Sequence, residues 1–265
     1  MRNNHEIDYH IFGEEMQYVE VELDPQETAI AESGSFMMMD DGIQMNTIFG
    51  DGSQQQQSSG IMGKLLSAGK RLLVGESLFM TTYTNVGQGK KRVSFASPYP
   101  GKIIPLDLQQ LGHKVICQKD AFLCAAKGVA IGIEFQRKLG TGLFGGEGFI
   151  MEKLEGDGLA FVHAGGHVLQ KELLPGELLK VDTGCIVAFT SSVNYDIQFI
   201  GGIKNTLFGG EGVFFATLRG PGTVWIQTLP ISRLAGRILA YGTYKRKEEG
   251  SILGGIGNVL DGDGW

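Results

Sequence analysis

The chain has 265 residues, of which 42% are hydrophobic and 20% are charged, and this composition excludes an intrinsically disordered protein. Its 41 glycines follow no triplet repeat, so we expect them in tight turns between short strands. The net charge of −6 lacks the basic excess that nucleic-acid binding requires, and we therefore expect no nucleic-acid partner.

Residues 1–15 carry acids where a targeting peptide would have an apolar or arginine-rich run. No apolar run in the chain approaches the roughly 18 residues that span a bilayer. The three cysteines, Cys117, Cys124 and Cys185, are odd in number and have no CxxC spacing, which favours small buried thiols in a reducing compartment. We therefore expect a cytoplasmic protein.

Short apolar segments, many of them alternating with polar residues, make up most of the chain. They include residues 93–97, 114–118, 185–189, 194–200 and 223–228. Segments of this length, rich in β-branched and aromatic residues and bounded by turn residues, predict strands. Strands that recur about every 8–12 residues are typical of a sandwich or barrel. The predicted fold is all-β with little helix.

An insertion at residues 50–74 interrupts the first group of strands. Its Ser/Gln tract indicates a flexible linker, and the following IMGKLLSAGKRLL fits a short amphipathic helix. The apolar residues of this segment are Ile61, Leu65, Leu66, Leu72 and Leu73. Such side chains must be covered by the chain's own body, by a protein partner or by a membrane, and membrane contact stays open. We predict that deleting residues 53–72 leaves the fold intact but lowers the oligomeric order or removes a partner.

Three segments share a Gly-Glu pair, an apolar strand and a Gly-x-Gly turn. They are GESLFMTTYTNVGQG at 75–89, GEGFIMEKLEGDG at 146–158 and GEGVFFATLRGPG at 210–222. Recurrence at intervals of about 65–70 residues indicates three copies of one unit. We predict one compact body with units at 7–98, 99–164 and 165–228, followed by a helix and glycine-rich tail at 229–265.

The glycines of the three turns are expected to have a structural role. They are Gly87, Gly89, Gly156, Gly158, Gly220 and Gly222. Residues 119–125 also align with residues 183–189, and residues 27–31 align with both more loosely. After the third unit, residues 232–245 predict a short helix with Ser232 as its N-cap. Its apolar face consists of Leu234, Ile238 and Tyr241.

Residues 201–230, GGIKNTLFGGEGVFFATLRGPGTVWIQTLP, and residues 181–197, VDTGCIVAFTSSVNYDI, resemble the bacterial "altered inheritance of mitochondria" proteins. That family is grouped structurally with the tryptophan RNA-binding attenuation protein (TRAP). The resemblance extends over nearly the whole chain and implies three TRAP-like β-sandwich repeats, in the double-stranded β-helix class, around a pseudo-threefold axis. Mitochondrial members are linked to inner-membrane organisation, but the resemblance implies no biochemical activity. The lysine-containing RNA motifs of TRAP have no counterpart here.

Glu76, Glu147 and Glu211 occupy the same place in the three motifs. The favoured interpretation is that each carboxylate accepts backbone N–H bonds in its glycine turn. If three units surround an axis, the glutamates would instead converge and bind a hard cation through oxygen ligands. They are weak candidates for a metal site.

His163 and His167, with Glu172, form the stretch that most resembles a metal site. Metalloenzymes of the double-stranded β-helix class place two histidines one residue apart on a strand, whereas these flank Ala-Gly-Gly, which suggests a turn. His113 is a candidate for a further ligand. The favoured interpretation is a pair of partly exposed turn histidines without a metal.

Neither a nucleophile elbow nor a phosphate-binding loop occurs, and the cysteines lie in apolar runs that raise a thiol pKa. We therefore expect no enzyme and no cofactor, but a homo-oligomeric scaffold or binding protein. Two alternatives remain open. One is a small-ligand sensor with clefts between units, as TRAP holds tryptophan between subunits. The other is a metal-dependent enzyme at His163 and His167.

Overall fold

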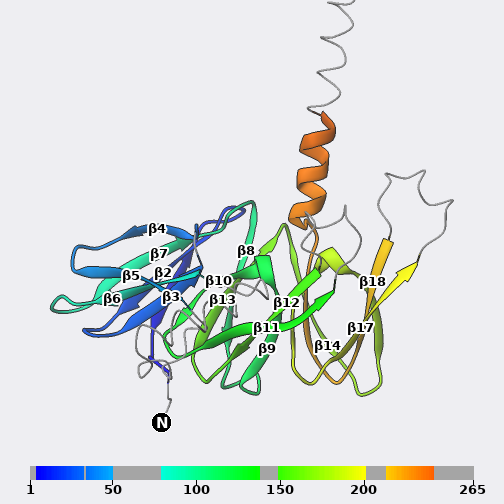
Figure 1. Ribbon diagram of the computed structural model, residues 1–265, viewed down its shortest axis with the longest axis horizontal. Helices are drawn as coiled ribbons and strands as arrows, with labels where there is room; N and C mark the ends of the chain where they lie inside the picture. Colours follow the sequence, from blue (N-terminus) through cyan, green and yellow to red (C-terminus); the bar gives the residue numbers. More distant parts are fainter. Residues whose placement is uncertain (1–3, 33, 50–78, 138–148, 201–212, 242–265) are drawn as a thin grey trace, which may run out of the picture.

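The computed structural model describes residues 4–32, 34–49, 79–137, 149–200 and 213–241 (Figure 1). These residues form nineteen strands in four sheets, two short 3-10 helices and one helix at 231–241. The all-β class and the short C-terminal helix that the sequence predicts are confirmed. Within the described residues, no helix is long and apolar enough to cross a membrane.

The two outer sheets contain four and three strands. The first has the order β1 (Asp8–Phe12), β2 (Tyr18–Leu23), β7 (Lys91–Ala96) and β4 (Phe36–Met39), and the last has the order β15 (Leu178–Asp182), β18 (Val213–Arg219) and β17 (Asn194–Ile200).

The two central sheets contain six strands each. One has the order β5 (Ile43–Phe49), β6 (Phe79–Asn85), β3 (Thr28–Glu32), β10 (Phe122–Ala126), β13 (Leu159–Gly165) and β8 (Gly101–Asp107). The other has the order β11 (Ala130–Arg137), β12 (Phe149–Glu155), β9 (Lys114–Gln118), β16 (Ile186–Thr190), β19 (Gly222–Gln227) and β14 (Val168–Leu173).

Alternation of buried and half-buried residues explains β2 of the first outer sheet. In β2 the side chains of Val19, Val21 and Leu23 are buried, and the residues between them are only half-buried. This period of two is the pattern of a strand with one face on a core and one toward water. The segments predicted at 114–118 and 194–200 coincide with β9 and β17.

Three hydrophobic cores lie between the four sheets. The first core contains Val21, Phe95, Tyr83 and Phe161, the second contains Leu106, Val162, Leu154 and Trp225, and the third contains Phe149, Phe189, Ile197 and Leu218. Each six-stranded sheet therefore has a core on both of its faces. This explains why all five residues of β10, and all five of β16, are buried.

The strand order is the same in three successive sets of six strands, β2–β7, β8–β13 and β14–β19. In each set the sixth strand lies between the first and the third, and the fifth lies between the second and the fourth. The predicted boundary at 98/99 lies between β7 and β8, and that at 164/165 falls within the last two residues of β13. The packing of three repeats about a pseudo-threefold axis stays a prediction.

The aligned segments 119–125 and 183–189 have the same local structure. Each begins with a 3-10 helix, η2 (Lys119–Ala121) or η3 (Thr183–Cys185), that leads into β10 or β16. Residues 27–31 do not correspond to them, because they fall on β3, which pairs with β10 in the same sheet. The looser alignment was therefore wrong.

The C-terminal helix begins at residue 231, so Ser232 lies inside its first turn and is not the N-cap. The carbonyl of Pro230 accepts the first hydrogen bonds, from the amides of Arg233 and Leu234. Proline at the entry is compatible with this, since the position requires no N–H donor.

The insertion at 50–74, with its apolar residues, lies outside the described residues. The same holds for the glycine-rich tail beyond residue 241. The expectation that Ile61, Leu65, Leu66, Leu72 and Leu73 contact a partner stays a prediction.

Candidate binding surfaces and the His163 cavity

The three glycine turns connect the fifth and sixth strands of each set. Gly87 and Gly89 lie between β6 and β7, Gly156 and Gly158 between β12 and β13, and Gly220 and Gly222 at the junction of β18 and β19. The glutamates that open these motifs, Glu76, Glu147 and Glu211, lie outside the described residues. Neither their structural interpretation nor their metal-binding interpretation is tested.

The second turn, at Gly156 and Gly158, packs closely against Asn4. A Cβ atom at Gly156 would lie 2.5 Å from the end of the Asn4 side-chain amide, and one at Gly158 would lie 2.9 Å from the Cβ of Asn4. Asn4 is buried there, and its backbone N–H donates to the carboxylate of Asp157 at 3.0 Å. Only glycine leaves room for this contact, so the turn has a packing role.

His163 lies on β13 with 2% of its surface exposed, so the expectation of a partly exposed turn histidine was wrong for this residue. Its Nε2 lies 3.1 Å from the carbonyl oxygen of Tyr99, and a hydrogen bond to that acceptor requires a proton on Nε2. Its Nδ1 is buried and has no hydrogen-bond partner among the described residues. Burial lowers the pKa of His163 to about 4, so the ring is neutral at pH 7.

The other candidate ligands lie apart from His163. His167 is exposed in the turn before β14, and Glu172 accepts a hydrogen bond from the hydroxyl of Thr223. The ring of His113 is hydrogen-bonded at 3.1 Å to the carbonyl of Gly156. Over the described part of the chain, no three His, Cys, Asp or Glu side chains come together in a way that would hold a metal ion.

A small cavity lies beside His163, where β9, β13 and β19 approach the start of the C-terminal helix. Its lining includes Tyr99, Gln118, Asp120, His163, Gln227 and Ser232. The side chain of Gln227 joins two of the surrounding segments, since it accepts from the amide of Gly165 at 2.7 Å and donates to the carbonyl of Gly184 at 2.9 Å. The cavity volume of about 20 Å³ is sufficient for a water molecule but far below that of an organic-ligand site.

Two carboxyl groups near the junction of the two six-stranded sheets have pKa values well above the ordinary value of 4.5. Burial, with the charge of Glu32, raises the pKa of Glu152 on β12 to about 8. Burial, with the charge of Asp120, raises the pKa of Glu32 on β3 to about 7. No sequence signal marked these residues, because their burial depends on strands distant in the chain.

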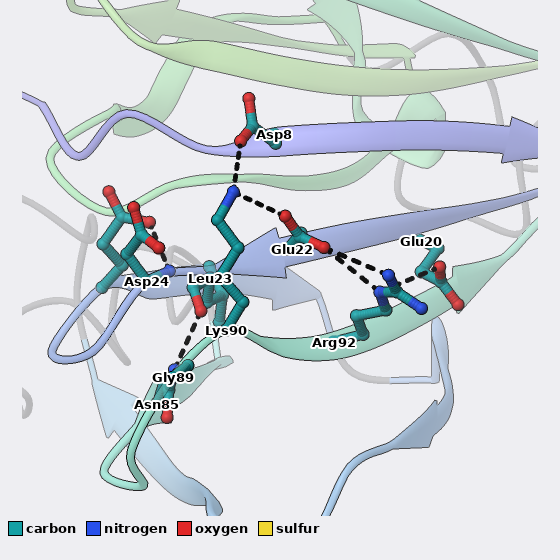
Figure 2. A network of polar contacts seen from close by, with 10 residues as sticks. Asp8, Glu20, Glu22, Leu23, Asp24, Asn85, Gly89, Lys90 and Arg92 are labelled. Carbon is teal, nitrogen blue, oxygen red and sulfur yellow. Dashed lines mark hydrogen bonds and ion pairs between the residues drawn. The ribbon is translucent and has the colours of Figure 1, made fainter.

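The basic run at residues 90–92 is compensated by acids on the outer face of the first sheet. Figure 2 shows Lys90 between Glu22 and Asp8, with Nζ–O distances of 2.7 and 3.2 Å. Arg92 lies 3.3 Å from Glu22 and 3.6 Å from Glu20. The hydrogen bond from Lys90 lowers the pKa of Glu22, as expected for a paired carboxylate. Two of the three cations are therefore paired, and the absence of nucleic-acid affinity stays a prediction.

An exposed apolar surface lies on β4, which has β7 on one side and, among the described strands, none on the other. The exposed fractions of Phe36, Met37, Met38 and Met39 are 38, 48, 43 and 39%. Single exposed apolar residues are common, but four in succession on one strand leave apolar side chains exposed on both of its faces. The run FMMM was visible in the sequence, whereas its exposure was not, because exposure depends on whether another strand pairs with this edge, and none of the described strands does.

The C-terminal helix projects away from the sheets (Figure 1). Ile238, Leu239 and Tyr241 are exposed, so the body of the protein leaves most of the predicted apolar face uncovered. This is a second apolar surface, but it lacks the unpaired backbone edge of β4.

Comparison with known proteins shows a match of residues 9–229 to the family model described as mitochondrial biogenesis AIM24. An uncharacterized protein of Streptococcus pyogenes serotype M6, M6_Spy0233, is 31% identical over 227 residues, which cover 84% of this chain and 86% of that protein. The crystal structure of the Streptococcus pyogenes protein SPYM3_0169, a structural genomics target, matches with a TM-score of 0.68 at 24% identity. That match covers 89% of this chain and 99% of the other, and it shows similarity of fold.

Proposed function

The chain belongs to the mitochondrial biogenesis AIM24 family, and we propose that it is a non-enzymatic binding protein or scaffold whose contact surface is the exposed strand β4. The observation that carries this proposal is the row of four exposed apolar side chains, Phe36 to Met39, on an edge strand. The likeness of the fold to TRAP stays a prediction.

An edge strand offers a partner two kinds of contact at once. Its outward N–H and C=O groups pair with an added strand, and its side chains select what can pack beside them. Methionine suits such a surface, because its flexible and polarizable side chain adapts to different neighbours. A protein partner that adds a strand therefore fits β4 better than a small molecule does.

The two alternative functions receive less support from the described residues. A sensor requires a cleft that encloses its ligand, whereas the cavity between the second and third sets of strands is water-sized. A metal-dependent enzyme at His163 and His167 requires converging ligands, whereas His163 is buried and His167 is exposed in a turn.

A cytoplasmic location is part of the same proposal. Cys117, Cys124 and Cys185 are all free thiols, and two of them are fully buried. Burial raises the pKa of Cys117 and Cys124 well above its ordinary value, which keeps these thiols protonated. Reduced cysteines without a disulfide suit a reducing compartment.

Site-specific photo-crosslinking in cells tests the contact surface. A photoreactive amino acid replaces Met37 on β4 or, as a control, Met45, an exposed methionine on the edge strand β5. We expect protein adducts from position 37 and few from position 45. Absence of adducts at position 37, or equal adducts at both positions, would contradict the proposed function.

A further inference from the structure

Two strands at opposite ends of the molecule each have one edge that no described strand pairs with. β4 pairs only with β7, and β15 pairs only with β18. In Figure 1, β4 lies at one end of the long axis and β18, the neighbour of β15, lies at the other. Their counterparts in the other sets of strands are paired on both sides.

Those counterparts form two internal joins with one geometry. The third strand of the second set, β10, pairs antiparallel with the second strand of the first set, β3. The third strand of the third set, β16, pairs in the same way with the second strand of the second set, β9. Among the described strands, β4 is the third strand of a set with no second strand at its outer edge, and β15 is the second strand of a set with no third strand there.

The local geometry of β4 supports this correspondence. The pairing of β10 with β13 shifts register between Phe122 and Cys124, and that of β16 with β19 shifts between Ile186 and Ala188. The pairing of β4 with β7 shifts at the same place, between its first and third residues. Thus Met38 corresponds to Cys124 and to Ala188.

We propose that β15 of one copy of this chain pairs antiparallel with β4 of another copy, so that Met38 lies opposite Val181. The internal joins set this register, because Cys124 lies opposite Ala31 and Ala188 lies opposite Cys117. Ala31 and Cys117 are the fourth residues of β3 and β9, and Val181 is the fourth residue of β15. The same rule places Met39 opposite Lys180 and Asp40 opposite Leu179. This deepens the proposed function, on which it rests, by naming the partner as a second copy.

The side chains that meet at the two internal joins are apolar, and the same is expected of the proposed join. Cys124 and Ala31 both belong to the first core, and Ala188 and Cys117 both belong to the second. Val181 belongs to the third core, so Met38 of the other copy would extend that core across the join. β10 and β16, which have such partners, are fully buried, whereas β4 is exposed.

Lys180 is the residue in which the proposed join departs from the internal ones. Its counterparts Ile30 and Ile116 are apolar and buried. A lysine on an edge strand weakens pairing with a further strand. We therefore expect a reversible, concentration-dependent association. Because the join is head-to-tail, it generates a ring if the rotation closes and a filament if it does not.

Sedimentation velocity over a range of protein concentrations, up to about 0.1 mM, tests the join from both sides. We expect Met38→Lys to weaken self-association by about tenfold or more, since it places a charge in the extended core. We expect Lys180→Ile to tighten it by a similar factor. The matched controls are Met45→Lys, with the same exposed fraction of 43% as Met38, and Lys171→Ile on the edge strand β14; neither should change the affinity.

Three outcomes would overturn the proposal. One is a Lys180→Ile chain that stays monomeric at every concentration. Another is equal behaviour of Met38→Lys and Met45→Lys. The third is sensitivity to Met38→Lys alone, which would mean that two β4 strands pair with each other. Photo-crosslinks from position 37 to a different protein, without self-association, would leave the proposed function standing and remove only this inference.

Discussion

Glu152 is a carboxyl group whose ionisation opposes folding. Burial raises its pKa to about 8 from the ordinary value of 4.5. The unfolded chain therefore releases a proton between about pH 4.5 and pH 8 that the folded chain retains, and stability falls as the pH rises through this window. Glu32, with a pKa of about 7, contributes in the same direction.

We accordingly predict that Glu152→Gln stabilises the protein at alkaline pH. The amide keeps the shape of the protonated carboxyl and cannot ionise, so the gain should be about 2 kcal/mol at pH 8.5 and near zero at pH 4.5. Urea unfolding at the two pH values measures it. The matched control is Glu155→Gln on the same strand, a half-exposed carboxylate paired with Lys153 at 2.9 Å, which should bring no gain. Equal effects of Glu152→Gln at both pH values would show that ionisation of Glu152 does not oppose folding.

His163 shows at the residue scale why the candidate site was only partly predictable. The Gly-Gly pair after Ala164 indicated a turn, yet β13 continues to Gly165, which pairs with Gly101 on β8. A Cβ atom at Gly101 would overlap the carbonyl oxygen of Ala164, so glycine here permits the close approach of two strands. Sequence alone does not distinguish a glycine that bends the chain from one that makes room for a neighbour.

At the scale of the element, the pairing of β8 with β13 therefore depends on Gly101. We predict that Gly101→Ala destabilises the protein by about 3 kcal/mol, because the overlap is with backbone and cannot be relieved by a side-chain rotation. Thermal or urea unfolding measures the loss. Gly236→Ala in the C-terminal helix, where a Cβ atom meets nothing within 4 Å, should be neutral or stabilising. A Gly101→Ala variant as stable as the wild type would show that the strands can separate at low cost.

The position of a strand could be predicted where a local sequence pattern identifies it, but the strands that pair with it could not. β9 and β17 coincide with predicted segments because short β-rich runs bounded by turns identify a strand. The residues of β10 are all buried and those of β4 are 38–48% exposed, and this difference depends on whether another strand pairs with the outer edge. That is a property of the sheet order, which joins residues far apart in the chain.

At the scale of the whole molecule, four sheets and three cores form a row (Figure 1). β4 in the first sheet and β15 in the last each have one edge that no described strand pairs with. The recurring strand order accounts for both edges, since each is half of a join that occurs twice within the chain. Self-pairing would remove an exposed apolar edge that otherwise invites aggregation. The molecule is therefore expected to associate through one specific backbone pairing between copies.

Hydrogen–deuterium exchange at low and high protein concentration measures that pairing most directly, because a strand join protects the outward amides of both strands. We predict slower exchange at high concentration for residues 37–40 and 179–182 together, with no change in the edge strand β5. Exchange that is independent of concentration in both segments, or protection of β4 without β15, would rule out the pairing of β4 with β15.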